Sequence, residues 1–373
     1  MRVYFATTMY PNDADGFRGV FMRNVLAALA RVPELDLTAW TPPGDLPRGV
    51  RIATTAPERE WLAKLLNEGG ISHLIRAGGV RGMMAPITLL RHLRAGYRRH
   101  PDVDLYHINW LQTALPLPDD GKPALVTVLG NDLNLLRLPF VRTLLRRVFS
   151  GRRVAICPNA EWMEAPLRAA FAGVAEVVPV SFGIDPTWYA IERPRIVEPP
   201  NRWIVVSRLT RNKMGPLFEW GQRAFASPER ELHLYGPMEE EIEMPGWVHY
   251  HGPASPRLLA NEVFPAARGL ITLSQHAEGR PQVLLEAMAA SLPIVASDTP
   301  AHASIVTHGE TGLLCNSPGE LVAALDRLET ANANTAFGEA GRRMMTVKIG
   351  TWDDCAHRYH RVYQRLLAEH NGG

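Results

Sequence analysis

The stretch GLITLSQHAEGRPQVLLEAMAASLPIVASD, residues 269–298, contains the pattern that decides the fold. Its apolar runs 269–273 and 294–296 predict two strands. Between these runs, a short loop with Pro281 leads into a helix that is predicted to begin near Gln282. A strand, a loop, a helix and a second strand in this order are typical of a parallel α/β sheet.

The same alternation extends over the whole chain. Further apolar runs predict strands at 2–6, 105–108, 124–128, 154–157, 177–180, 203–206, 232–235 and 248–250. The proline-rich stretch 186–200 is predicted to be a linker. The chain of 373 residues is therefore predicted to contain two α/β domains, 1–185 and 201–350, followed by a helix over 351–373.

Composition and charge exclude several classes of protein. Apolar residues make up 46% and charged residues 21%, which is typical of a soluble globular protein. A net charge of +2 gives no strong field for nucleic acid. The three cysteines lie far apart, and no run of about 18 apolar residues could span a membrane. We therefore expect a cytoplasmic protein with no nucleic-acid partner.

The basic residues are concentrated in two windows of the first domain. Residues 71–100 and 133–153 each contain six arginines and no acidic residue. Apolar residues interleave with these arginines at roughly helical spacing. The pattern is consistent with a solvated helix face, and equally with a peripheral surface for anionic lipid headgroups at the inner face of a membrane.

Two cations follow the first predicted strand of the second domain. In WIVVSRLTRNK, residues 203–213, the strand ends in a loop that carries Arg208 and Lys213. The carboxyl end of a strand in an α/β sheet is where a phosphate binds, and both side chains are suitable donors. By themselves, Arg208 and Lys213 could also be two exposed loop residues with no role in binding.

Two glutamates eight residues apart flank the start of the predicted helix in 269–298. Glu278 lies in the loop, and Glu286 lies on the helix, where its carboxylate could accept two hydrogen bonds from a vicinal diol such as ribose. The spacing alone proves nothing, because Glu60 and Glu68 share it, as do Glu231 and Glu239. The strand–loop–helix–strand context distinguishes the pair at 278 and 286.

The run EGRPQVLLEAMAASLPIVASD resembles the signature of the retaining, nucleotide-sugar-dependent glycosyltransferases of GT-B fold. The stretch VVSRLTRNK resembles their phosphate-binding loop, and 232–236 and 248–252 resemble the two strand–glycine segments that follow it. Looser similarities occur at 16–24, 104–110, 126–132 and 178–185. The resemblance implies two Rossmann-like domains that face an interdomain cleft, with the C-terminal helix crossing back to the first domain.

The resemblance implies a role for each matching residue. Arg208 and Lys213 would hold the diphosphate and stabilise its charge on leaving, and Glu278 would contact the transferred sugar as the third catalytic residue. Glu286 would hold the ribose diol. Backbone N–H groups at Gly19, Val283 and Leu284 would face the donor. The co-substrate would be a nucleoside diphosphate sugar, and we expect no metal or other cofactor.

On the acceptor side, the histidines that are frequent in the family are partly replaced. His107 and Asn109 stand where the family often has His-x-His, and Asp132 ends a segment that often reads His-Gly-x-Asp. These three residues are the acceptor-side candidates. The acceptor would be a glycan or a lipid-linked glycan, as in polysaccharide biosynthesis. In the donor domain, Ser291 stands where the family commonly has a glycine.

Other motifs favour structural explanations. Asp102-x-Asp104 leads into a strand of the first domain, and His357-x-x-His360 is a helix pair without a third ligand. We interpret His249-x-His251 as strand residues on opposite faces rather than as a metal site. Two other functions stay open: a nucleotide-sugar epimerase or hydrolase on the same fold, and a non-catalytic glycan- or nucleotide-binding protein.

Overall fold

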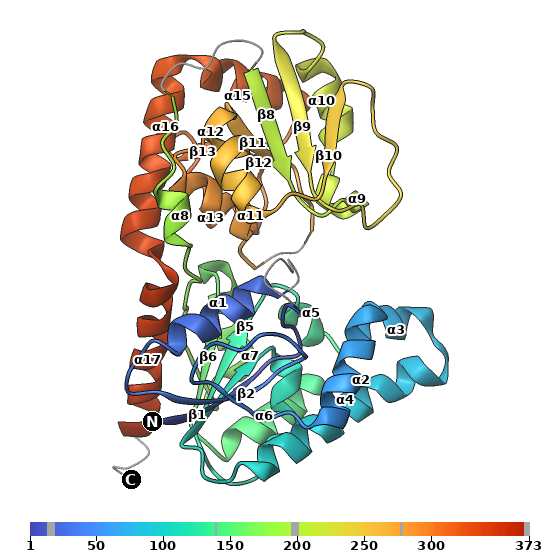
Figure 1. The fold of residues 1–373 in the computed structure, drawn as a ribbon, viewed down its shortest axis with the longest axis vertical. Helices are drawn as coiled ribbons and strands as arrows, with labels where there is room; N and C mark the ends of the chain where they lie inside the picture. The colour runs from blue at the N-terminus through green and yellow to red at the C-terminus, as the bar shows by residue number, and fades with distance from the viewer. Residues whose placement is uncertain (13–18, 139, 195–200, 277–278, 369–373) are drawn as a thin grey trace. The chain divides into compact units, whose positions relative to one another are not determined.

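The computed structural model describes residues 1–12, 19–138, 140–194, 201–276 and 279–368 (Figure 1). The chain forms two compact units. The first contains Met1–Phe182 and the C-terminal segment from Trp352, and the second is Gly183–Thr351.

The described residues of the first unit form a seven-stranded parallel sheet in the order β3-β2-β1-β4-β5-β6-β7. Its strands are β1 (Arg2–Ala6), β2 (Asp36–Trp40), β3 (Arg51–Ile52), β4 (Leu105–Asn109), β5 (Ala124–Val128), β6 (Val154–Pro158) and β7 (Glu176–Val177). Its helices are α1 (Val20–Leu29), α2 (Ala56–Asn67), α3 (Ile71–Ala77), α4 (Gly79–Arg99), η1 (Leu111–Ala114), α5 (Asp132–Leu135), α6 (Val141–Ser150), η2 (Glu161–Met163), α7 (Glu164–Phe171) and α17 (Trp352–Ala368).

Helices cover both faces of this sheet, so its strands read as continuous apolar runs. In β1, Val3 and Phe5 point to one face and Tyr4 and Ala6 to the other, because successive strand residues alternate. Helices α1 and α17 pack on the first face, and α2, α4, α6 and α7 pack on the second (Figure 1). The apolar stripe of α17 is buried against the sheet and α1, so this helix belongs to the first unit.

The described residues of the second unit form a six-stranded parallel sheet in the order β10-β9-β8-β11-β12-β13. Its strands are β8 (Asn201–Val206), β9 (Arg230–Tyr235), β10 (Val248–Gly252), β11 (Gly269–Thr272), β12 (Ile294–Ser297) and β13 (Gly312–Cys315). Its helices are α8 (Pro186–Tyr189), α9 (Arg211–Met214), α10 (Leu217–Ala224), α11 (Pro256–Leu258), η3 (Leu259–Val263), α12 (Phe264–Ala266), α13 (Gln282–Ala289), α14 (Pro300–Ala303), α15 (Pro318–Glu329), α16 (Ala331–Met344) and η4 (Met345–Ile349).

The start of the predicted linker 186–200 is not a linker. Asp185 caps α8 by accepting a hydrogen bond from the Thr187 N–H at 2.9 Å. Between Pro186 and Pro194, the side chains of Trp188 and Ile191 are buried in the apolar core of the second unit, so this part of the chain belongs to that unit. Residues 195–200, the remainder of the predicted linker, lie outside the described residues.

The helices also bear on how the protein could meet a membrane. No helix in the described part of the chain is both long enough and apolar enough to cross a bilayer.

Candidate functional site

The strand order of the second sheet marks a candidate binding edge. The chain moves from β8 outward through β9 and β10, then returns to the other side of β8 with β11. Loops that leave neighbouring strands in opposite directions open a crevice at the carboxyl ends, where ligands of α/β proteins bind. The segments after β8 and β11, which carry the predicted donor residues, begin at this switch point.

Close backbone contacts hold these two segments together. The Gln275 N–H donates to the Asn212 carbonyl at 2.8 Å. Gly215 has a φ of +53°, and a Cβ there would lie 2.1 Å from the Leu273 carbonyl oxygen. Only glycine fits such an approach without displacing the backbone. Helix α9, which carries Lys213, is therefore fixed against the end of β11.

Arg208 is paired in this structure. Its side chain is 44% exposed, and Nη1 lies 2.9 Å from Oε2 of Glu239. A phosphate at this position would compete with that carboxylate. In the sequence, Glu239 stands out only through its spacing from Glu231, because the loop that brings it to Arg208 follows a different strand. Lys213 is partly buried, and its N–H donates to Oγ1 of Thr210 at 3.3 Å.

Helix α13 begins at Gln282, as predicted, and presents Glu286. Removal of hydration raises the pKa of Glu286 to about 8, and the carboxylate of Asp185 adds to this effect. A raised pKa for a carboxyl group at a binding edge is typical of functional sites. No sequence pattern indicates that Asp185 is a neighbour of Glu286, because the two residues lie about a hundred positions apart in the chain.

The other predicted donor contacts of this helix differ from one another. Val283 is partly exposed, whereas the Leu284 side chain is fully buried. The Leu284 N–H donates to the Pro281 carbonyl at 3.2 Å, so in this conformation it is used within the first turn. Glu278 lies outside the described residues.

The first sheet has a second switch point, between β1 and β4, and Gly19 lies in the segment after β1. Gly19 has a φ of +78°, and a Cβ there would lie 2.9 Å from the Tyr10 nitrogen and from Cγ of Met9. Helix α1 follows directly and has neither a side-chain cap from a described residue nor an acidic residue in its first turn. Its first N–H groups are therefore suited to an anion.

The structure corrects the prediction for His107. Its side chain is fully buried, and its ring nitrogens form hydrogen bonds with the hydroxyl of Tyr363 and, at 2.9 Å, with Oγ1 of Thr127. Burial lowers the pKa of His107 to about 3. His107 thus joins β4 to α17 and β5 inside the core and does not face an acceptor.

Asn109 is at the switch point, but it is also buried. Its Nδ2 donates to the Ala6 carbonyl at 2.9 Å, whereas Oδ1 has no hydrogen-bond partner among the described residues. The next residue, Trp110, has a φ of +71°, an uncommon value for a residue with a side chain. An unpaired buried oxygen beside a strained residue is consistent with a site that a ligand or water completes.

Asp132 connects the loops that follow β4 and β5. Its two carboxylate oxygens accept hydrogen bonds from the Leu111 N–H at 2.7 Å and the Leu129 N–H at 2.8 Å. Burial raises the pKa of Asp132 to about 7. The side chain is buried and fully engaged, so its observed role is to hold these loops.

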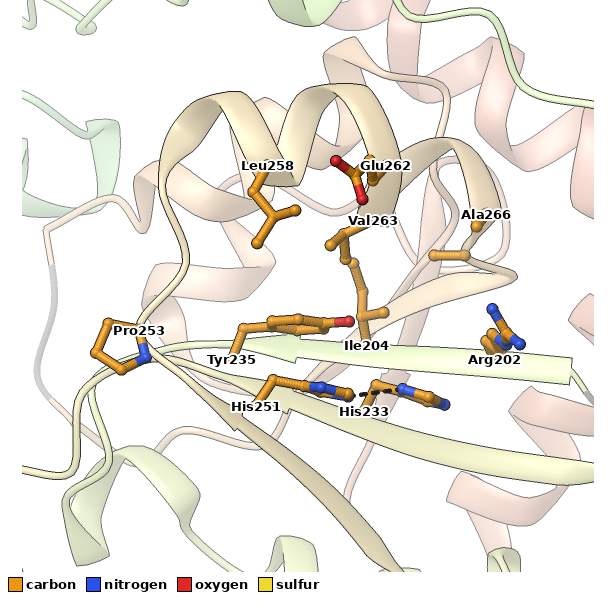
Figure 2. Close-up of a pocket in the computed structure, with 11 residues that line it drawn as sticks. Arg202, Ile204, His233, Tyr235, His251, Pro253, Leu258, Glu262, Val263 and Ala266 are labelled. Atoms are coloured by element: carbon orange, nitrogen blue, oxygen red, sulfur yellow. Dashed lines mark hydrogen bonds between the residues drawn. The ribbon is translucent and has the colours of Figure 1, made fainter. Parts of the chain in front are cut away.

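A cavity of about 390 Å³ lies elsewhere in the second unit and contains none of the predicted site residues (Figure 2). Its floor is one face of β8, β9 and β10, with Tyr235, His233 and His251, and its roof includes Leu258 and Glu262 of α11 and η3. The prediction that His249 and His251 lie on opposite faces is wrong. Residues two apart in a strand share a face, and the rings of both histidines stack on His233.

Comparison with known proteins agrees with this architecture. Residues 201–330 match the family model described as glycosyl transferases group 1. A curated protein of Xenopus tropicalis, glycosyltransferase 1 domain-containing protein 1, is 40% identical over 57 residues. That match spans only 15% of this chain and 16% of the frog protein.

Solved structures match over nearly the full length. Sucrose-phosphate synthase from Thermosynechococcus elongatus has a TM-score of 0.73 at 16% identity, with 99% of this chain and 100% of that chain covered. A glycosyltransferase from Rickettsia africae has a TM-score of 0.67 at 10% identity, with 98% of both chains covered. Anabaena HepE in complex with UDP and glucose has a TM-score of 0.65 at 13% identity, with 98% and 99% covered. These structural matches confirm the predicted GT-B fold.

Proposed function

We propose that the protein is a retaining glycosyltransferase that moves a sugar from a nucleoside diphosphate donor to a glycan or a lipid-linked glycan. The observation that carries this proposal is the set of Arg208, Lys213 and Glu286 around one switch point in a domain of the glycosyl transferases group 1 family. HepE was crystallised with UDP-glucose, and the pneumococcal GtfA with UDP and GlcNAc. These complexes support UDP-sugars as the first donors to test.

In the proposed reaction, the bond between the anomeric carbon and the diphosphate breaks, and a bond to the acceptor oxygen forms on the same face. The leaving phosphate accepts the proton of the acceptor hydroxyl. Arg208 and Lys213 stabilise the charge that develops on the diphosphate. Arg208 would first exchange Glu239 for a phosphate oxygen. Glu286 binds the ribose hydroxyls, Glu278 contacts the sugar, and the N–H group at Val283 contacts the donor, without a metal ion.

Donor binding can be tested by thermal denaturation with UDP-, GDP-, dTDP- and ADP-sugars in EDTA. We expect one nucleotide class to raise the Tm of the wild type, because a ligand at 100 times its Kd stabilises by about 2.7 kcal/mol. Glu286→Ala should respond much less, whereas Glu310→Ala, at an exposed position of the same unit, should respond like the wild type. No response to any nucleotide sugar would contradict the proposal.

Catalysis requires a separate test. Lys213→Ala should lower kcat far more than it raises the KM for the donor, because the charge that Lys213 meets appears in the transition state. NMR analysis of the product should show a new glycosidic bond with the anomeric configuration of the donor. Release of free sugar, or a changed sugar on the nucleotide, without acceptor would instead identify a hydrolase or an epimerase.

We also propose that the first unit acts at the cytoplasmic face of an anionic membrane. Figure 1 shows α3 and the adjacent end of α4 extending away from the sheet of this unit. Large apolar side chains are exposed on these helices and near α6: Ile75, Val80, Met83, Met84, Ile87, Leu138, Phe140 and Leu144. Exposed arginines accompany them on α4 and α6: Arg81, Arg91, Arg94, Arg98, Arg142 and Arg147.

Several arginines of the two basic windows are structural instead. Arg99 pairs with the buried carboxylate of Glu58 at 2.6 Å, and Arg152 is buried beside Asp120 at 3.4 Å. Arg146 donates to the Ala170 carbonyl at 2.9 Å. Variants that test membrane binding should therefore leave these three residues unchanged.

Sedimentation with vesicles tests the membrane proposal. We expect salt-sensitive binding to phosphatidylglycerol vesicles and much weaker binding to phosphatidylcholine vesicles. Val80→Asp with Met83→Asp should reduce the binding, as should reversal of Arg91, Arg94 and Arg98 to Glu. Arg257→Glu, in the second unit, has the same net charge change as the double aspartate variant and is its control. Unchanged binding by both sets of variants would contradict the proposal.

A further inference from the structure

The edge strands of the second sheet carry a cluster of histidines that the proposed glycosyl transfer does not use. In β9, Leu232 and Leu234 point into the core, so Glu231 and His233 point to the opposite face. The parallel register places His249 of β10 directly beside His233. His251 follows on the same face, and a register irregularity occurs between Tyr250 and Gly252.

Short distances connect the four polar side chains of this cluster. Nε2 of His233 lies 2.9 Å from Oε2 of Glu231, and Nδ1 of the same ring lies 2.9 Å from Nε2 of His251. The ring centroids of His233 and His249 are 4.8 Å apart. One coordinating atom from each of Glu231, His233 and His249 falls within 4.8 Å of the others.

The ligand types in this cluster suit a transition metal. Imidazole nitrogens and a carboxylate oxygen are the groups that bind Zn²⁺ and similar ions in proteins.

We propose that Glu231, His233 and His249 bind one divalent transition-metal ion of the zinc or cobalt type, with His251 as a hydrogen-bond partner of His233. The ion would replace the proton between Nε2 of His233 and Oε2 of Glu231. The Nδ1–H of His233 would then donate to Nε2 of His251, as the non-coordinating nitrogen of a metal-bound histidine usually does. Nitrogen and carboxylate ligands bind Zn²⁺ at about 2.0–2.2 Å.

One local feature fits this assignment. His249 is exposed, so its side chain can approach the other two ligands without disturbing the core. The metal would have to displace Arg202, whose Nε lies 3.6 Å from Oε2 of Glu231. The site joins β9 to β10 and is independent of the donor site, so its test does not depend on the proposed enzymatic activity.

Metal titration of tag-free protein, dialysed first against EDTA, tests this site. We expect one Co²⁺ per chain, with visible absorption bands of a histidine-coordinated ion, and displacement of Co²⁺ by Zn²⁺. Mg²⁺ should not compete, because it prefers oxygen ligands. His249→Ala and Glu231→Gln should each weaken binding by more than about tenfold, and His251→Ala by about tenfold. His357→Ala, which removes an exposed histidine of the other unit, should have no effect.

The ligand variants must retain the fold for the comparison to be decisive. His249 is exposed and the Glu231 side chain is partly exposed, so the metal-free variants should match the wild type in circular dichroism and Tm. Absence of saturable binding by the wild type below about 100 μM would overturn the proposal. Wild-type affinity in His249→Ala and Glu231→Gln would overturn it as well, because the ion would then bind elsewhere.

Discussion

Replacing Glu286 by Gln should change how the stability of the protein depends on pH. In the folded protein, burial and the neighbouring Asp185 raise the pKa of this carboxyl group from 4.5 to about 8. Below pH 4.5 the group is protonated in both states and contributes no pH dependence. Between pH 4.5 and 8 the unfolded chain loses this proton while the folded chain retains it, so the free energy of unfolding falls as pH rises.

The size of the effect follows from the pKa difference. Each pKa unit corresponds to about 1.4 kcal/mol. The free energy of unfolding should therefore fall by about 4–5 kcal/mol between pH 4.5 and 8 and stay at that lower value at higher pH. A glutamine has nearly the same shape and no charge. Glu286→Gln should therefore differ little in pH dependence below pH 5 and become more stable than the wild type by several kcal/mol at pH 9.

Urea denaturation at pH 5, 7 and 9, followed by circular dichroism, would measure this difference. Glu310→Gln, at an exposed position of the same unit, is the matched control and should show no such trend. At pH 9, where Glu286 is ionised, Glu286→Gln should bind the donor more weakly than the wild type does, because an amide cannot accept two hydrogen bonds from a diol as well as a carboxylate does. A Glu286→Gln curve parallel to that of the wild type from pH 5 to 9 would refute the reasoning.

Three further substitutions test other features of the structure. Ser291 has a φ of +56°, so Ser291→Gly should raise the free energy of unfolding by about 1 kcal/mol and Ser291→Ala should not, as urea titration would show. Tyr363→Phe removes a partner of the buried His107 and should cost about 1–3 kcal/mol in the same assay; an unchanged midpoint would contradict that hydrogen bond. Gly215→Ala should destabilise the second unit and weaken donor binding, because the added Cβ would collide with the Leu273 carbonyl oxygen. Gly319→Ala is the control and should be tolerated, because a Cβ there has open space around it. Equal effects of the two substitutions in thermal denaturation would argue against the contact at Gly215.

The second domain could be predicted largely from its sequence. The predicted strands at 203–206, 232–235 and 294–296 lie within β8, β9 and β12, and α13 begins at the predicted residue. Local patterns suffice for β12, whose four residues are all buried, because a strand buried on both faces needs a continuous apolar run. The strand β2 was missed because its run DLTAW mixes polar and apolar residues, although all but its first residue are buried.

The acceptor side could not be predicted in the same way. The sequence shows His107 at the end of a strand, where a binding residue is expected, but α17 covers this position. Tyr363, whose hydroxyl forms a hydrogen bond with the His107 ring, lies 256 residues away in the chain. No local pattern relates these two residues, so the family resemblance assigned a buried histidine to the acceptor side.

The sequence by itself determined the alternation of strands and helices, the division into two parallel sheets and the position of Arg208, Lys213 and Glu286 in segments that follow two of the strands. Each of these depends on a short stretch of chain, through apolar periodicity, turn residues and capping. Only the tertiary structure decided which residues meet: Arg208 with Glu239, Glu286 with Asp185, and His233 with His249 and His251. These contacts follow from the order of strands in the sheet, which is set by burial over the whole unit rather than by any local pattern.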